Sequence, residues 1–73
     1  MHKSRTRVRL LPGQYLTQAL VAAKGMMYDD FFTLIEQAYW KAWDKDETCV
    51  PVIIKGVCMM VPWEAFEVRE IKE

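Results

Sequence analysis

The side chains best suited to chemistry in this sequence are three arginines near its beginning, Arg5, Arg7 and Arg9, spaced two residues apart. Alternate residues of a β-strand point to one face, so a strand here would carry three guanidinium groups on the same side. Guanidinium groups make bidentate contacts with guanine edges, phosphates and carboxylates. The pattern predicts either a cationic face that contacts DNA or protein, or a solvated face paired with glutamates of the tail.

The other reactive residue types lack the spacing of a catalytic or metal site. His2 is the only histidine, so no zinc site is expected, and the acidic group at 44–47 lacks the central glycine and twelve-residue spacing of a calcium loop. Cys49 and Cys58 lie in apolar strand-like sequence, which favours reduced, buried thiols over a disulfide framework. We therefore expect a protein that is not an enzyme and that uses no cofactor and no metal.

The composition indicates one small globular domain over residues 1–73, with 1–4 frayed. Ten basic and ten acidic residues give a formal net charge of zero, and 52% of the residues are hydrophobic. A chain of this length buries only about 60% of its unfolded surface, so a homodimer or another partner would stabilise it. No apolar run reaches the roughly 20 residues of a membrane span, and 12–14 interrupt the apolar region that a signal peptide needs. Cytoplasmic residence is the resulting expectation.

The hydrophobic pattern predicts a strand followed by helix. Residues 5–11 alternate, with apolar side chains opposite the arginines, and 14–24 show apolar residues at helical spacing. Gly25 is placed to end that helix, and Asp29 or Asp30 can cap a second one that runs to about Trp43. A single long helix with a kink near Gly25 fits the same pattern.

Residues 49–61 predict a tight hairpin whose strands are apolar on both faces. Lys55 and Gly56 supply the turn, which sets Ile54 opposite Val57 and Ile53 opposite Cys58. One face then carries Val50, Val52, Ile54, Val57, Met59 and Val61, and we expect a helix to cover it. The other face carries Ile53, Cys58 and Met60, flanked by Pro51 and Pro62, and we expect a partner to cover that patch.

The second helix carries aromatic residues outside its apolar arc. The arc comprises Phe31, Leu34, Ile35, Ala38, Tyr39 and Ala42. Trp40 falls on the polar side, while Phe32 and Trp43 lie at its edge. Trp40 either packs under the N- or C-terminal segment or anchors a partner. Beyond Pro62, residues 65–71 predict an edge strand whose acidic side chains could lie beside the arginine strand.

The expected fold is a small α+β domain: an N-terminal strand and one long or two short helices, packed on a C-terminal antiparallel hairpin plus an edge strand. Residues 5–43, a strand, a Pro-Gly step, a helix, a Gly25 turn and a second helix, resemble the ribbon-helix-helix family of DNA-binding repressors. The resemblance implies an intertwined dimer in which paired strands enter DNA and Arg5, Arg7 and Arg9 read bases. Met27, the neutral net charge and the strands of 48–73 depart from the family pattern.

Two functional hypotheses follow. The first is a non-enzymatic protein-binding module, of the kind that phage or mobile elements encode to inhibit or regulate host machinery, which binds through Trp40, Trp43, Phe32, Ile53, Cys58 and Met60. The alternative is a dimeric ribbon-helix-helix-like transcriptional regulator that uses the arginine strand. The neighbour of strand 5–11 distinguishes them, since pairing with its own copy favours DNA and pairing with the C-terminal strands favours protein.

Overall fold

The computed structural model describes the backbone of residues 6–70 and the side chains of 7–69, so Arg5, His2 and the frayed segment predicted at 1–4 lie outside the described residues. The elements are β1 (Thr6–Leu10), α1 (Gln14–Ala22), α2 (Tyr28–Asp44), β2 (Val50–Ile54), β3 (Val57–Val61), the short 3₁₀ helix η1 (Trp63–Ala65) and β4 (Phe66–Glu70). The strands form two antiparallel pairs, β1 with β4 and β2 with β3. The predicted α+β fold is confirmed, and of the two predicted alternatives the structure has two helices and not one kinked helix.

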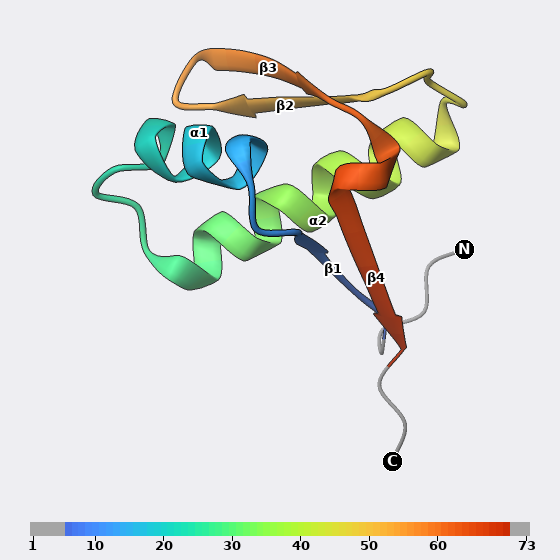
Figure 1. Cartoon of the computed structure of the whole chain (residues 1–73), viewed down its shortest axis with the longest axis horizontal. Helices are drawn as coiled ribbons and strands as arrows, with labels where there is room; N and C mark the ends of the chain where they lie inside the picture. The colour runs from blue at the N-terminus through green and yellow to red at the C-terminus, as the bar shows by residue number, and fades with distance from the viewer. Residues whose placement is uncertain (1–5, 71–73) are drawn as a thin grey trace.

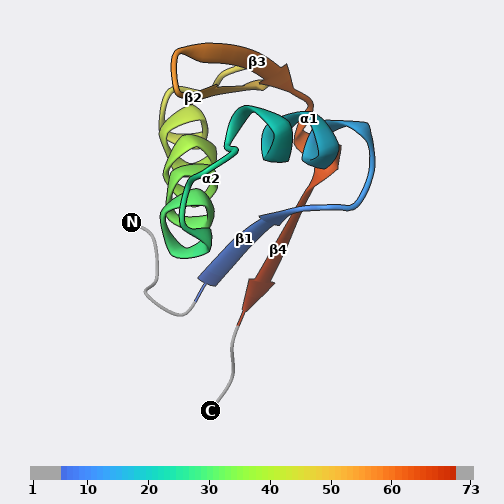
Figure 2. The ribbon, with the colours of Figure 1, turned by 90° about the vertical axis from the view of Figure 1, so that its left-hand side faces the viewer.

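Helix α2 lies between the two strand pairs, with the β2–β3 hairpin on one side and β1–β4 on the other (Figure 1 and Figure 2). The predicted arc of α2 supplies the centre of the core, since Phe31, Ile35, Tyr39 and Ala42 are buried. The remaining buried residues come from both strand pairs and from α1 with the residue after it: Val8, Leu10, Ala19, Ala23, Val50, Val52, Ile54, Val61 and Phe66. Within the described part of the chain, no helix is long and apolar enough to cross a bilayer.

The last strand pairs with the first, and not with the hairpin. Its register sets Val8 opposite Val68, Arg9 opposite Glu67 and Arg7 opposite Arg69. The alternation predicted for the first strand is confirmed, because Val8 and Leu10 face the core and are only 2% and 7% exposed. The proposed neighbourhood of the arginine strand and the acidic tail strand is confirmed.

The two helices are separate, and their boundaries correct one prediction. Helix α2 begins at Tyr28 with Met27 as its N-cap and no side-chain capping hydrogen bond, so the prediction that Asp29 or Asp30 caps it was wrong. Both aspartates instead lie in the first turn, where their charge is favourable to the helix dipole. Helix α1 ends at Ala22, and Gly25 adopts a φ of +87° in the turn that follows.

The hairpin has the predicted register, from Ile54 opposite Val57 to Pro51 opposite Met60. Lys55 and Gly56 have φ values of +50° and +83°, as a two-residue hairpin turn requires. The predicted burial holds for β2, but Val57 is 52% exposed, so its expected place under a helix was wrong. Helix α2 packs against β2 and leaves β3 at the margin of the core.

Candidate functional site

The outer face of the hairpin is open, as the sequence predicted. Ile53 is 60% exposed, Met60 is 55% exposed and Cys58 is also exposed. We call these three residues the hairpin face. Ile53 and Cys58 stand opposite each other in the ladder, and Met60 follows two positions along β3 on the same side. None of the five residues of β2 or the five of β3 is charged, so the hairpin face carries no ionic group of its own strands.

The two long edges of the hairpin differ in their hydrogen-bonding capacity. The two residues that flank a two-residue turn form a hydrogen-bonded pair, and hydrogen-bonded and non-hydrogen-bonded pairs then alternate along the ladder. Pro51, Cys58 and Met60 belong to non-hydrogen-bonded pairs, so their backbone groups point outward, away from the other strand. Pro51 has no N–H, which weakens the β2 edge as a pairing site. Cys58 and Met60 carry outward N–H and C=O groups, and among the described residues no turn or loop backbone group bonds to them. The β3 edge can therefore accept another strand.

Both cysteines are free thiols, but the prediction that they are buried was wrong. Cys58 is exposed and Cys49 is half-buried. Cys58 is exposed because it lies on the outer side of β3, where no second layer of the described chain covers the side chains. Cys58 is thus part of an exposed apolar surface and not of the core.

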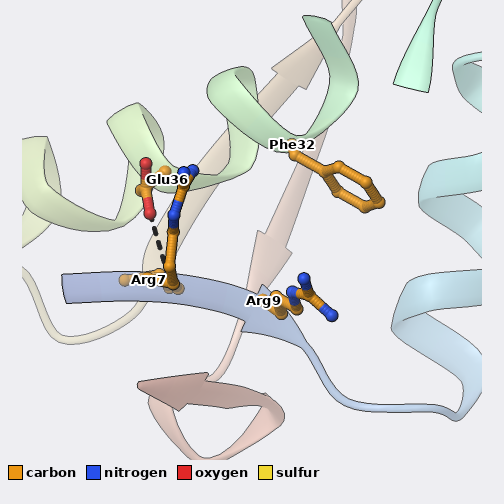
Figure 3. Close-up of a pocket in the computed structure, with 5 residues that line it drawn as sticks. Arg7, Arg9, Phe32 and Glu36 are labelled. Atoms are coloured by element: carbon orange, nitrogen blue, oxygen red, sulfur yellow. Dashed lines mark hydrogen bonds between the residues drawn. The ribbon is translucent and has the colours of Figure 1, made fainter. Parts of the chain in front are cut away.

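The arginine strand meets helix α2 along its edge (Figure 3). Arg7 and Arg9 are exposed, and the Arg9 guanidinium carbon lies 5.7 Å from the centroid of the Phe32 ring. The Glu36 carboxylate accepts a hydrogen bond from the Val8 backbone N–H at 3.0 Å. These residues enclose a hollow of about 40 Å³, which is the size of a water site and not of an organic ligand.

The pairing of β1 with β4 adds a cation that sequence reasoning did not assign to this face. Directly opposite residues of a strand pair share a face, so Arg69 joins Arg7. Glu67 on the same face forms an ion pair with Arg69, with Nε and Oε1 3.3 Å apart. The described face therefore keeps an excess of positive charge, to which Arg5 cannot be added because it lies outside the described residues.

An aromatic cluster occupies the end of α2 and the start of the last segment. Tyr39 lies at its centre, with ring centroids 4.9 Å from Trp40, 5.1 Å from Trp63 and 5.2 Å from Phe66. Trp40 is partly buried against the core, in keeping with the packing interpretation. Trp43 is 59% exposed and Phe32 is 43% exposed, which leaves both accessible to a partner.

Sequence reasoning missed Trp63, which it treated only as part of a bend. Trp63 and Trp43 line a hollow of about 390 Å³ together with Asp46 and Glu47. The signal available in the sequence was a tryptophan directly after a proline, next to the end of the hairpin. A second omission is the N-terminal end of α2, where Met27 and Tyr28 are 72% and 74% exposed.

No protein-family model matches the chain, and no curated protein or solved structure matches it. Among the described residues, no group of three or more His, Cys, Asp or Glu side chains is placed to hold a metal ion. The candidate site is a set of three surfaces: the hairpin face, the face of β1 and β4 that carries Arg7, Arg9 and Arg69, and the exposed end of the aromatic cluster.

Proposed function

We propose that this protein is a non-enzymatic protein-binding module that presents the hairpin face to another protein chain. One observation carries the proposal: Ile53 and Met60 are more than half exposed on a pair of strands with no charged residue. Exposed apolar surface of this kind, next to an open strand edge, is typical of an interface. Such a module would inhibit or regulate its target by covering a surface of that target.

The partner that we propose first is a second copy of the chain. The formal net charge of zero places no long-range repulsion between copies. A domain of 73 residues is also marginal in size, so the burial of two hairpin faces would stabilise both copies. Stacked faces bury Ile53, whereas pairing of two β3 edges leaves Ile53 in solvent, so the two arrangements can be separated experimentally.

Sedimentation of the full chain, from micromolar to sub-millimolar concentration, tests the proposal with two variants. Ile53→Lys places a charge on the hairpin face of β2, away from the β3 edge, and should abolish dimerisation. Met60→Pro removes an outward N–H that the hairpin ladder does not use, and Met60→Ala is its matched control.

If dimerisation survives Ile53→Lys and Met60→Ala but is lost in Met60→Pro, the two copies associate through paired β3 edges and not through stacked hairpin faces. A wild-type chain that stays monomeric and binds no apolar-surface dye would contradict the proposal. A monomer that does bind the dye would exclude the second copy as the occupant of the face.

The pairing of β1 with β4, and not with its own copy, favours the protein-binding module. A DNA-binding regulator is the second candidate, because the same pairing sets Arg69 beside Arg7 on the face that also carries Arg9. Contacts between these arginines and phosphates would release counterions, so binding should weaken steeply with salt. A gel-shift assay on duplex DNA at low salt tests this function. Arg7→Ala should abolish a shift, and the absence of any retarded duplex would remove the candidate.

A further inference from the structure

Two indole rings form a corner between the end of α2 and η1. The ring centroids of Trp43 and Trp63 are 6.3 Å apart, and the ring planes meet at 81°. The rings and the loop residues Asp46 and Glu47 line a hollow of about 390 Å³. We call this site the tryptophan corner. It uses none of the residues of the hairpin face, so it stands independently of the proposed function.

The walls of the tryptophan corner are held by the residues behind them. The Tyr39 ring stacks on Trp43 at 6.3 Å and meets Trp63 edge-on at 5.1 Å. The Trp63 indole N–H donates a hydrogen bond to the backbone carbonyl of Glu47 at 3.0 Å, which fixes the second wall to the loop. Because both rings have their contacts in the free chain, little ordering is needed when a ligand enters.

The loop that forms the rim is also fixed. The Asp46 N–H donates to the Trp43 carbonyl at 3.1 Å, and the Glu47 N–H donates to the Ala42 carbonyl at 3.1 Å. Asp46 adopts a φ of +54°, a left-handed conformation that aspartate tolerates better than most residues. The two acidic residues therefore stay beside the tryptophans at the end of the helix.

The electrostatics of the corner favour a cation. The faces of indole rings are negative and attract ammonium and guanidinium groups within about 6 Å of the centroid. Two acidic residues line the same hollow, none of the described basic residues does, and the adjacent helix end carries the negative pole of the helix dipole. An apolar ligand would use the rings but would gain nothing from the carboxylates.

We propose that the tryptophan corner binds an organic cation, namely the guanidinium or methylated ammonium group of a side chain presented by a partner protein. Trp43 and Trp63 supply the ring faces, and Asp46 and Glu47 supply the charge. The hollow exceeds the volume of the head group alone, which leaves room for the alkyl chain that carries it.

The test is a titration followed by the indole N–H resonances of the full chain in two-dimensional NMR. The probes are choline, its neutral isostere 3,3-dimethyl-1-butanol, and the capped amino acids Nα-acetyl-arginine methylamide and Nα-acetyl-trimethyllysine methylamide. We expect saturable shifts of the Trp43 and Trp63 resonances with the cations, and affinity about tenfold weaker for the neutral alcohol, as a cation–π contribution of about 1.4 kcal/mol implies.

Two variants keep the outcome clear. Trp43→Ala should weaken cation binding about tenfold, and Asp46→Asn with Glu47→Gln should weaken it while leaving both rings in place. Tyr28→Ala, at an exposed aromatic residue outside the corner, is the matched control and should bind as the wild type does. Equal shifts with choline and its neutral isostere, or no saturable shift in the millimolar range, would overturn the proposal. Tighter binding of choline than of both capped amino acids would show that the ligand of the tryptophan corner is a free small cation and not a side chain of a partner protein.

Discussion

The Glu36 carboxylate accepts a hydrogen bond from the backbone N–H of Val8 at 3.0 Å, across 28 residues of sequence. Val8 can make this bond because its backbone groups point away from β4. The Leu11 N–H donates to the Ala65 carbonyl at 2.8 Å, so Leu11 and Ala65 form a hydrogen-bonded pair at the end of the β1–β4 ladder. Hydrogen-bonded and non-hydrogen-bonded pairs alternate, and Val8, three positions from Leu11, therefore belongs to a non-hydrogen-bonded pair. Glu36 thus occupies the outer edge of β1 at Val8 and joins that edge to α2.

Removal of this side chain should destabilise the fold. We expect Glu36→Ala to lower the free energy of unfolding by about 1–2 kcal/mol, because the Val8 N–H loses a partly buried, charged acceptor. Glu36→Gln retains an oxygen acceptor and should cost about half as much. Urea denaturation followed by circular dichroism measures both. Gln37→Ala, at an exposed position of the same helix, is the control, and an equal loss in all three variants would exclude a specific role for the bond.

Two neighbouring isoleucines of β2 should respond differently to the same truncation. Ile54 is fully buried and Ile53 is 60% exposed. Ile54→Val should cost about 1 kcal/mol of stability, through lost burial and a small cavity, whereas Ile53→Val should cost close to nothing in the monomer. Chemical denaturation at low protein concentration measures the difference. Equal costs would mean that the outer face is covered in solution.

The hairpin turn depends on glycine at one of its two positions. Gly56 has a φ of +83°, and no atom beyond its two chain neighbours lies within 4 Å of the place that a Cβ would occupy, so Gly56→Ala should cost about 1 kcal/mol through backbone strain alone. Lys55→Ala, in the same turn, should cost less, because it removes only the exposed contact of the Lys55 ammonium with the Lys24 carbonyl. Thermal denaturation of both variants compares them, and a reversed order would contradict the assigned turn.

Stability should fall at alkaline pH through Tyr39. Burial raises the pKa of the Tyr39 phenol above its ordinary value of 10.0. The unfolded chain then loses this proton before the folded chain does, so the contribution is present below pH 10.0 and is lost as the pH rises above it. Denaturation of the wild type and Tyr39→Phe on both sides of that pH measures the effect. A wild type that declines no faster than Tyr39→Phe would contradict it, and Tyr28→Phe controls for the loss of one exposed hydroxyl.

Local patterns in the sequence were sufficient for much of the fold. The alternation around Arg7 and Arg9, the apolar arc of α2 and the Lys55-Gly56 turn each predicted an element that the structure contains. The open patch of Ile53, Cys58 and Met60 was also predictable, because a two-residue turn fixes which side chains share a face. These features depend on neighbours within a few residues, which the sequence states directly.

Which distant segments meet is visible only in the folded chain. The sequence alone indicated the strands, the presence of helix between them, the hairpin register and the lack of charge on β2 and β3, but it left open whether there are one or two helices. It did not determine that α2 separates two strand pairs, that Glu36 binds the edge of β1, or that Trp63 closes a corner with Trp43. Those contacts join residues far apart in the chain, and many pairings bury similar apolar area. The packing of the whole core selects among them, and no local pattern encodes that selection.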